Sequence, residues 1–411
     1  MKLYNIRNDQ KGIYIRLMKH LLLKLKTLIR ETDMLLLFLC AAASFFGIVM
    51  VYSATRANIP EGGFISRDAR TMLLAVAIGF VFAVTVSFID YNFITKMFPL
   101  IGAVCIALML ALFIWGKGPV ERPDAKTWLS LGSSGLYFQP SELLKIGFII
   151  TFGMHLELIS DKITQLLHVL LLCAHAAIPI GLVALTGDMG SALIFIVIFL
   201  VMMFCAGVQL RYFAIGAALV AAAAPAIWYF IFDATQKNRI LGLIYPERYA
   251  DIMYQQNQGM RAITSGGFTG QGLFNGALTQ VENAIPEAEN DMIFTCIGEE
   301  LGLIGCTAAL LLILGVIARV MFVGHKSRFG ATKLMCYGFA GMIAAQTIVN
   351  IGMCLSLLPV IGITLPFFSA GGSSNLCVYI GVGLILSIYR FDKEKQAVRF
   401  RFSNHTPFSG N

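Results

Sequence analysis

The stretch IPEAENDMIFTCIGEELG, residues 285 to 302, places five carboxylates in a chain that is 57% hydrophobic and only 13% charged. They are Glu287, Glu289, Asp291, Glu299 and Glu300. A carboxylate that reaches a hydroxyl group can remove its proton and so act as a general base. Asp291 stands at the start of the apolar run MIFTCI, where its side chain can face a cavity while the next residues enter the protein. Position alone leaves a chemical and a structural role for Asp291 equally open.

The other four acids of this stretch have simpler interpretations. Glu287 and Glu289 lie in a polar connection, and we expect them to be solvated. Glu299 and Glu300 lead into a long apolar stretch, and acidic residues are favourable at the positive end of a helix. We therefore expect Glu299 and Glu300 to cap that helix.

An ionisable pair stands out in TWLSLGSSGLYFQPSELLK, residues 127 to 145. Pro140 suits the first turn of a helix. Glu142 and Lys145 are three residues apart and share one helix face, at or just inside a membrane. Ionisable side chains at that depth either serve a functional site or form a buried pair that fixes helix register. The sequence does not decide between these two roles.

Asp188, in LTGDMGSALIF, lies in a turn with Gly187 before it and Gly190 shortly after it, between two apolar stretches. An aspartate in such a turn commonly caps the helix that follows. Capping is the simpler interpretation, and Asp188 is also a candidate for the wall of a polar cavity.

Two further segments are rich in residues that interrupt helices. Six glycines lie between residues 259 and 276, too many for a regular helix and suited to backbone that lies close to a ligand. Their spacing is not that of a phosphate- or dinucleotide-binding loop. Residues 356 to 374 contain two prolines and the pair Gly371-Gly372, and non-helical backbone at membrane depth must be buried in protein or line a cavity. The polar residues of this segment, which favour a cavity, are Ser369, Ser373 and Ser374.

The elements that must position these residues are membrane-spanning helices. Apolar stretches near twenty residues in length are typical of transmembrane helices. We predict an all-α polytopic membrane protein with about ten spans and without a soluble module. The predicted spans are residues 34–54, 71–90, 97–116, 140–158, 166–185, 189–207, 211–232, 301–323, 333–355 and 375–391.

Basic residues set the predicted orientation, because short cytoplasmic connections are rich in lysine and arginine. The first 33 residues, the connection after the eighth span and the C-terminal tail are basic, and ten spans put all three on one side. Both termini are therefore expected to be cytoplasmic. We expect residues 1–33 to form a basic segment at the membrane surface, 34–391 the ten-span domain and 392–411 a cytoplasmic tail. The long connection 233–300, between spans seven and eight, then lies outside, with 55–70, 117–139 and 356–374.

The same composition excludes other classes of protein. The formal net charge of +8 comes from residues that cluster at span ends, where anionic headgroups explain them without a nucleic acid. The nine cysteines show no CxxC or paired spacing, so neither a disulfide framework nor a zinc site is indicated. The N-terminal segment lacks the apolar core and cleavage site of a signal peptide. No internal repeat is evident, which weakens the case for a transporter built from inverted halves.

Six motifs, in this order, resemble the sequence blocks of one family of bacterial cell-wall proteins. FQPSELLK, GDMGSAL, SGGFTGQG, PEAENDMIF, GEELGLIG and LPFFSAGGSS are similar to the FQPSE, PDLGT, SGGxxGKG, PExHTDFIF, GEELG and LPFISYGGSS blocks of the SEDS family (shape, elongation, division and sporulation), which comprises RodA, FtsW and SpoVE. The resemblance covers about residues 34–391. The segment NIGMCLSLLPVIGITLPF is closer in appearance to the RodA branch.

The resemblance implies a peptidoglycan glycosyltransferase that polymerises lipid II at the outer face of the bacterial cytoplasmic membrane, in cell elongation or a related wall programme. It implies that Asp291 is the catalytic residue and that a class B penicillin-binding protein, a transpeptidase, is the partner. Together with the serines noted above, the matching positions give these expected substrate and cavity residues: Glu142, Lys145, Asp188, Gln258, Ser265, Gly266, Gly267, Ser369 and Ser373.

The chain departs from the family pattern in four places. The departures are Glu289-Asn290 for His-Thr, Gln271 for the lysine of GKG, Thr127 for the arginine before Trp128, and Gly187 for a proline. Three of them remove an actual or potential cation near an anionic substrate, so we expect a divalent cation, Mg²⁺ or Mn²⁺, to offset the charge of the pyrophosphate.

Two alternatives to the enzyme remain open on the sequence. One is a flippase for lipid-linked precursors, and the other is a non-catalytic scaffold of a wall-synthesis complex. The long acidic connection favours the enzyme, because a flippase needs no general base.

Overall fold

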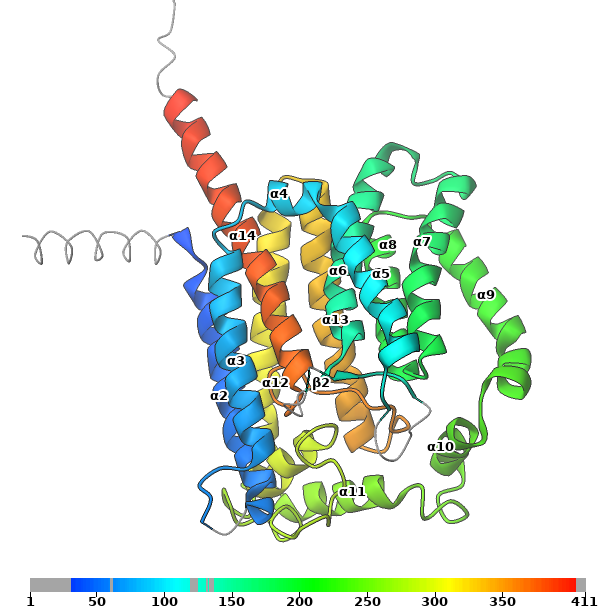
Figure 1. The fold of residues 1–411 in the computed structure, drawn as a ribbon, viewed down its shortest axis with the longest axis vertical. Helices are drawn as coiled ribbons and strands as arrows, with labels where there is room; N and C mark the ends of the chain where they lie inside the picture. Colours follow the sequence, from blue (N-terminus) through cyan, green and yellow to red (C-terminus); the bar gives the residue numbers. More distant parts are fainter. Residues whose placement is uncertain (1–30, 60–61, 119–124, 131, 133–136, 404–411) are drawn as a thin grey trace, which may run out of the picture.

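The computed structural model describes residues 31–59, 62–118, 125–130, 132 and 137–403, and its helices form one bundle (Figure 1). Eight of the described helices are long and apolar enough to cross a membrane. They are α2 (Met34–Ala54), α3 (Arg67–Val86), α5 (Phe98–Trp115), α7 (Leu166–Leu185), α9 (Leu210–Ala226, continued to Ile231 by a π-helical turn), α12 (Ile293–Lys326), α13 (Gly330–Cys354) and α14 (Gly372–Ser403).

Two more helices complete the set of predicted spans. They are α6 (Pro140–Leu158), which carries three charged residues, and α8 (Met189–Cys205), which has only 17 residues. Each of the ten predicted spans coincides with one of these ten helices in the described part of the chain. The predicted all-α polytopic membrane fold is confirmed.

The polar helix α6 is tolerated because it lies at the centre of the bundle. It packs against α5, α7 and α13, and most of its residues are buried. Small residues allow close approach at this centre. A Cβ atom on Gly338 of α13, for example, would lie 2.6 Å from the Sδ atom of Met202 on α8. At the other extreme, α9 has no buried residue and stands away from the bundle in Figure 1.

One end of the bundle carries most of the polar connections, and we call it the α11 end. Helices α10 (Ala234–Ile244) and α11 (Tyr254–Gly266) run across it, and the strand pair β1 (Leu129–Ser130) and β2 (Tyr137–Phe138) lies beside it (Figure 1). The short helix α4 (Tyr91–Lys96) lies at the opposite end, and 3₁₀ turns occupy Arg56–Asn58 and Ser160–Lys162.

The expectation that residues 259 to 276 are too rich in glycine for a helix is wrong for the first eight of them. Gly259 and Gly266 belong to α11, which lies against the first turns of α12. A Cβ atom on Gly266 would collide with the backbone carbonyl of Gly298. These glycines therefore serve close packing of two helices.

Two predicted helix starts are wrong by four residues or more. Helix α3 begins at Arg67 rather than at 71, and α12 begins at Ile293, eight residues before the predicted 301. In α12 the difference has a clear cause, because the helix consists of two parts that meet at Gly302, whose φ angle is 63°.

The break at Gly302 frees backbone groups that pair with the loop after α11. Four backbone hydrogen bonds join the two segments. They are Gln271 N to Glu299 O (2.9 Å), Gly272 N to Glu300 O (2.9 Å), Leu303 N to Gly267 O (3.0 Å) and Ile304 N to Phe268 O (3.2 Å). Gly302 has to be glycine here, because a Cβ atom would lie within 3 Å of backbone atoms of Phe268 and would meet the backbone nitrogen of Gly270.

The expectation that Glu299 and Glu300 cap a helix is wrong. Both side chains are fully buried before the break, and each accepts several hydrogen bonds. Glu299 binds Leu278 N, Thr279 N (both 2.8 Å) and Thr279 Oγ1 (2.6 Å). Glu300 binds Ser53 Oγ (2.7 Å), Gln280 Nε2 (2.8 Å) and Phe274 N (3.1 Å). The two acids hold the loop 273–280 against α2 and α12.

Parts of the predicted domain plan fall outside the described residues. The basic segment 1–33 lies there except for its last three residues, and so does the end of the tail, 404–411. Helix α14 continues to Ser403, past the predicted end of the last span at 391. The three-part division of the chain stays a prediction.

Candidate active site

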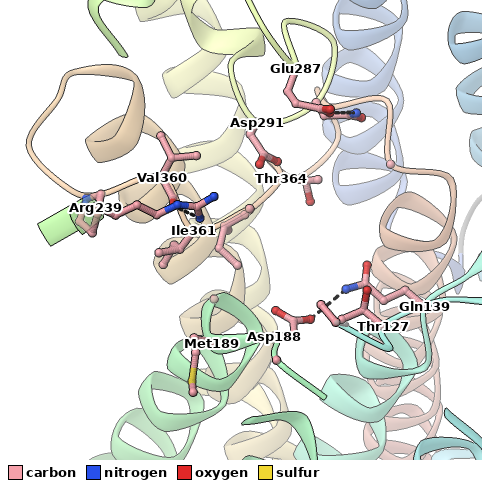
Figure 2. A pocket seen from close by; sticks show the side chains of 18 of the residues that line it. Thr127, Gln139, Asp188, Met189, Arg239, Glu287, Asp291, Val360, Ile361 and Thr364 are labelled. Carbon is pink, nitrogen blue, oxygen red and sulfur yellow. Dashed lines mark hydrogen bonds between the residues drawn. The ribbon is translucent and has the colours of Figure 1, made fainter. Parts of the chain in front are cut away.

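A polar cavity of about 380 Å³ opens near the α11 end, between the helix ends and the connections that cross them (Figure 2). Its wall comes from α6, the turn before α8, α10, the segment before α12, α13, the connection 359–364 and the start of α14. The acidic residues that line it are Glu142, Asp188, Glu287 and Asp291. Segments that are far apart in sequence thus supply one polar chamber.

Asp291 lies immediately before α12, and its side chain lines this cavity. Figure 2 shows Asp291 and Asp188 facing the cavity from opposite sides. Three consecutive backbone carbonyl groups around Asp291 accept hydrogen bonds that fix this segment. Their hydrogen bonds are Ala370 N to Glu289 O (2.9 Å), Ser369 Oγ to Asn290 O (2.7 Å) and Asn350 Nδ2 to Asp291 O (2.9 Å). Asp291 is therefore held in place by α13 and by the connection that precedes α14.

The environment of Asp291 favours its neutral form more than water does. Burial, followed by the negative charge of Glu287, raises the pKa of Asp291 from 3.8 to about 7, although the positive charge of Arg239 opposes the shift. A carboxyl group with a pKa near the working pH is suited to proton transfer.

The neighbouring acids differ in exposure. Glu287 is exposed, and its backbone has a φ angle of 53°, which is uncommon for a residue other than glycine. Its carboxylate accepts a hydrogen bond from Asn290 Nδ2 at 2.7 Å. Glu289 is only partly exposed, and burial raises its pKa. The expected solvation is thus correct for Glu287 and wrong for Glu289, which the fold partly covers.

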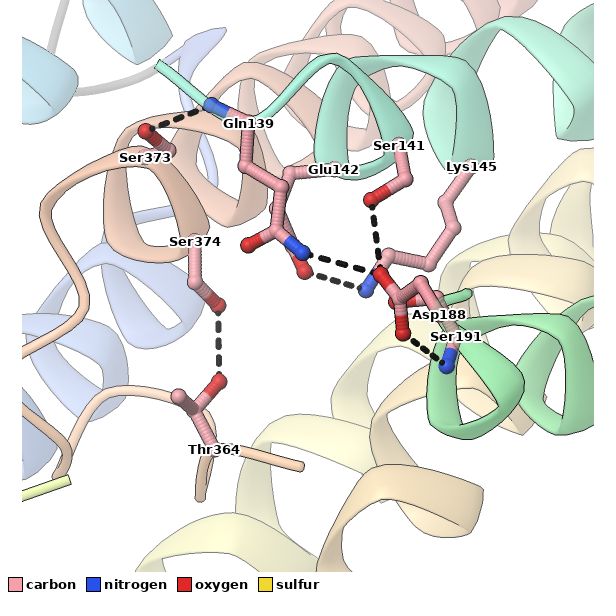
Figure 3. A network of polar contacts seen from close by, with 9 residues as sticks. All are labelled: Gln139, Ser141, Glu142, Lys145, Asp188, Ser191, Thr364, Ser373 and Ser374. Carbon is pink, nitrogen blue, oxygen red and sulfur yellow. Dashed lines mark hydrogen bonds and ion pairs between the residues drawn. The ribbon is translucent and has the colours of Figure 1, made fainter. Parts of the chain in front are cut away.

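Glu142 and Lys145 form a buried ion pair in the first turns of α6 (Figure 3). The distance from Lys145 Nζ to Glu142 Oε1 is 2.8 Å, and the two side chains are 1% and 8% exposed, respectively. Glu142 lines the cavity, whereas Lys145 lies behind it. Both roles left open by the sequence are therefore compatible with the pair, because it is buried and one member borders the cavity.

Asp188 combines a cap with a place in the cavity wall. Its Oδ1 atom accepts a hydrogen bond from Ser191 N at 2.9 Å and so caps α8. Its Oδ2 atom accepts from Gln139 Nε2 at 2.9 Å and from Ser141 Oγ at 3.4 Å (Figure 3). Gly187 precedes it with a φ angle of 84°, which a proline could not adopt.

The two predicted serines lie beside the cavity and hold its walls. Ser369 Oγ accepts a hydrogen bond from Leu365 N and donates one to Asn290 O, both at 2.7 Å. Ser373 Oγ accepts from Gln139 N at 3.2 Å. Neither lines the cavity, whereas Ser374 does.

Four other predicted residues lie on or just after α11, away from the cavity wall. Gln258 contacts Tyr254 and Arg261, and Ser265 Oγ accepts a hydrogen bond from Gln271 Nε2 at 2.8 Å. Gly266 and Gly267 lie where α11 meets α12. The structure does not bring these four to Asp291, and their contact with a substrate stays a prediction.

Among the residues not singled out from the sequence are Arg239 and Gln346, which line the cavity, and Asn350, which holds the backbone of Asp291 beside it. Arg239 of α10 is the one lysine or arginine among the described lining residues, and its Nη1 atom donates to Val360 O at 2.6 Å. Asn350 donates to Asp291 O and Ile363 O, and Gln346 lines the cavity one helical turn away. The sequence features that could have indicated these residues are the amides in the largely apolar α13 and the arginine in TQKNRI.

Comparison with known proteins identifies the chain. Residues 33–394 match the family of cell cycle proteins that comprises FtsW, RodA and SpoVE. The chain belongs to the FtsW/RodA/SpoVE family. A probable peptidoglycan glycosyltransferase FtsW of Geobacter sp. (strain M18) is 32% identical over 367 residues, which are 87% of this chain and 96% of that protein. The peptidoglycan glycosyltransferase MrdB of Escherichia coli (strain K12) is 30% identical over 368 residues, or 88% of this chain and 94% of that one.

Solved structures of the FtsW/RodA/SpoVE family share the fold. A chain of a peptidoglycan synthase complex, studied for its coordination of polymerization and crosslinking, superposes with a TM-score of 0.73 at 26% identity, covering 88% of this chain and 98% of that chain. The rod shape determining protein RodA of Thermus thermophilus gives a TM-score of 0.64 at 24% identity, covering 87% and 97%. The relatives include both FtsW and MrdB, so the closer likeness to the RodA branch stays a prediction.

Proposed function

We propose that this chain is a peptidoglycan glycosyltransferase that polymerises lipid II into glycan strands at the outer face of the bacterial cytoplasmic membrane, in cell elongation or a related wall programme. The observation that carries the proposal is Asp291: a carboxyl group with a pKa of about 7, on a fixed backbone, in the wall of a polar cavity near one end of a membrane bundle. The likeness to the peptidoglycan glycosyltransferases FtsW and MrdB supports the same reaction.

In the proposed reaction, a sugar hydroxyl of the acceptor lipid II attacks the anomeric carbon of the growing chain. Asp291 accepts the hydroxyl proton as the new C–O bond forms. The bond between the anomeric carbon and the pyrophosphate oxygen breaks, and its electron pair leaves with the lipid pyrophosphate. Arg239 lines the same cavity, and its guanidinium is suited to stabilise the negative charge on the leaving group.

Polymerisation by the purified full-length protein tests this function. With lipid II as the only substrate, we expect glycan strands to form, and strand length on a gel is the readout. Movement of lipid II across a bilayer without glycan strands would instead support a flippase. Activity of a complex that persists when this chain carries Asp291→Asn would support a scaffold.

The pH dependence of the rate is a prediction of the same assignment. A general base works only in its ionised form, and the pKa of Asp291 is about 7. The rate at low substrate should therefore rise about tenfold per pH unit below 7 and become constant above about 8. Initial rates between pH 5.5 and 9 measure this, and a rate that does not change between pH 5.5 and 8 contradicts the role.

We further propose that a divalent cation, Mg²⁺ or Mn²⁺, takes part in the reaction. No three His, Cys, Asp or Glu side chains gather into a metal site in the described ranges. Mg²⁺ is often held by only one or two carboxylates together with substrate phosphates. Asp188 lines the cavity and would be the carboxylate ligand in such an arrangement, and the ion would offset pyrophosphate charge. Loss of activity with a chelator and recovery with Mg²⁺ or Mn²⁺ test this, and full activity in the chelator contradicts it.

The orientation of the chain in the membrane is also a proposal. We place both termini in the cytoplasm, with the α11 end outside. In a background in which the exposed Cys173 and Cys205 are serine, an impermeant thiol reagent added to intact cells should label Glu282→Cys and not Arg328→Cys. The reverse pattern contradicts this topology.

We propose a class B penicillin-binding protein as the partner, which the likeness to a chain of a peptidoglycan synthase complex supports. Polymerisation should increase when such a transpeptidase is co-purified with the chain. An equal rate with and without the transpeptidase would contradict dependence on it.

A further inference from the structure

Helix α13 presents one stripe of polar side chains to the segment that carries Asp291. Gln346, Asn350 and Cys354 are each four residues apart and so lie on one helix face. Asn350 Nδ2 donates to Asp291 O and to Ile363 O, and Cys354 Sγ donates to Asp291 O at 3.5 Å. The two residues nearer the α11 end thus hold the segment of Asp291. Gln346 lies about one turn deeper, four residues or about 6 Å along the helix axis from Asn350.

Gln346 is buried but its oxygen is not used by the protein. Its side chain lines the cavity, the residue is 1% exposed, and Oε1 accepts no hydrogen bond from the described residues. Gln256 offers a comparison, because it is 2% exposed and donates from Nε2 to Met353 O (3.0 Å) and Leu358 O (2.9 Å). A buried amide group without a partner is unfavourable, so such a group in a cavity wall indicates a ligand.

The position of Gln346 is unusual even among buried polar atoms. The side chains of Thr32, His168 and Ser356 also have a buried nitrogen or oxygen without a hydrogen-bond partner among the described residues, but none of these three residues lines the cavity. The hydroxyls of Thr364 and Ser374 line the same cavity and are 3.1 Å apart (Figure 3). The cavity wall therefore offers uncharged groups capable of hydrogen bonds, Gln346 among them, as well as the charged Arg239.

The chemistry of Oε1 selects the part of a ligand that can lie here. An amide oxygen needs an N–H or O–H donor. A pyrophosphate at neutral pH offers essentially acceptors, and a lipid tail offers neither. A sugar hydroxyl or an acetamido N–H is a suitable donor. If the amide were turned over, Nε2 would take this place as a donor, which a sugar hydroxyl, an acetamido oxygen or a phosphate oxygen would satisfy, so the test below includes a diphosphate without sugar.

We propose that Gln346 binds the sugar part of the lipid-linked substrate, through a hydroxyl or acetamido group that lies beneath Asp291. The proposal rests on the proposed function. It assigns the uncharged amide of Gln346 to the sugar and leaves Arg239 to the pyrophosphate. Gln346 is in this sense a substrate-binding residue that does not take part in proton transfer.

Gln346→Leu in the full-length protein tests the proposal. We expect the KM for lipid II to rise about five- to tenfold, which is the loss of affinity expected when one hydrogen bond is removed, with a smaller change in kcat. The melting temperature without substrate should stay the same or rise, because an unpaired polar group is removed. The matched control is Gln256→Leu, which should lower the melting temperature because it leaves two carbonyl groups unpaired. A lower melting temperature of Gln346→Leu with an unchanged KM would overturn the proposal.

A polyprenyl diphosphate without sugar distinguishes contact of Gln346 with the sugar from contact with the pyrophosphate. As a competitive inhibitor it should bind the wild type and Gln346→Leu equally well, since it lacks the group that Gln346 contacts. Inhibition weakened as much as the KM for lipid II would place Gln346 at the pyrophosphate and overturn the proposal. A wild-type protein that neither polymerises nor binds lipid II would overturn the proposed function itself, which this pair of measurements distinguishes from a failure of Gln346 alone.

Discussion

Asp291→Asn is expected to reduce the rate of lipid II polymerisation roughly a hundredfold to ten-thousandfold, the usual effect of removing a general base. The asparagine keeps the shape of the side chain, and the hydrogen bond from Asn350 goes to the backbone carbonyl of residue 291, so the loop should remain in place. Only the ability to accept a proton at the cavity is removed. The measurement is glycan synthesis by purified protein with saturating and limiting lipid II.

A stability measurement separates this chemical effect from misfolding. Because burial raises the pKa of Asp291 above its ordinary value, ionisation of this group opposes folding. Its contribution to stability is complete below pH 3.8 and is lost as the pH rises through about 7. At pH 8 the Asp291→Asn protein should therefore melt at the same or a higher temperature than the wild type. A variant that is inactive and melts much lower would point to a structural role.

The neighbouring acids provide matched controls for Asp291. Glu287→Gln and Glu289→Gln remove a carboxylate from the same segment, but we expect each to change the rate far less than Asp291→Asn. Glu289 does not line the cavity, and the exposed Glu287 adjusts only the local potential. Wild-type synthesis by Asp291→Asn together with loss of synthesis by Glu289→Gln would make Glu289 the base.

Lys145→Met is expected to destabilise the protein by about 3–5 kcal/mol, because it leaves the buried carboxylate of Glu142 without its ion partner. Glu142→Gln leaves the ammonium group of Lys145 in the same situation. The double variant should be little worse than either single one, since it leaves no unpaired charge. Melting temperature and glycan synthesis of the four proteins form a double-mutant cycle, and fully additive losses would mean that the two residues act separately.

A more exposed ion pair is a suitable control for this cycle. Arg390 Nη2 contacts Glu31 Oε2 at 2.7 Å, and the Glu31 side chain is 29% exposed. Partly solvated pairs contribute about 1 kcal/mol or less. Glu31→Gln should therefore have a small effect on melting, although the distance in the two pairs is nearly the same.

The membrane helices could be predicted because their signal is local. Each span is an apolar stretch of suitable length, and even α6 was found because its three charged residues leave most of the stretch apolar. The glycine-rich helix α11 was missed, because sequence alone does not show that its glycines meet another helix. The break at Gly302 was missed for the same reason, since the partners of its backbone groups lie about 30 residues earlier.

The site could be predicted only in part. Asp291, Glu142 and Asp188 were expected at a polar cavity, and all three line it. Glu299 and Glu300 were misjudged because their partners include Ser53, 247 residues away from Glu300, which turns expected caps into buried anchors. Gln346 was not found, because one amide in an apolar helix does not reveal whether it faces lipid, protein or a cavity.

The anchoring by Glu300 limits how segments of this family can be exchanged. Ser53 on α2 and Gln280 in the connection both donate to Glu300, and the backbone of residues 267–272 pairs across the break in α12. A chimera that takes only residues 233–300 from a relative would keep Gln280 with Glu300 but would take Ser53, Leu303 and Ile304 from the host protein. A unit that keeps the contacts of Glu300 and of the break in α12 runs from α11 through Ile304 and includes position 53, so it does not follow the boundary between connection and membrane helix.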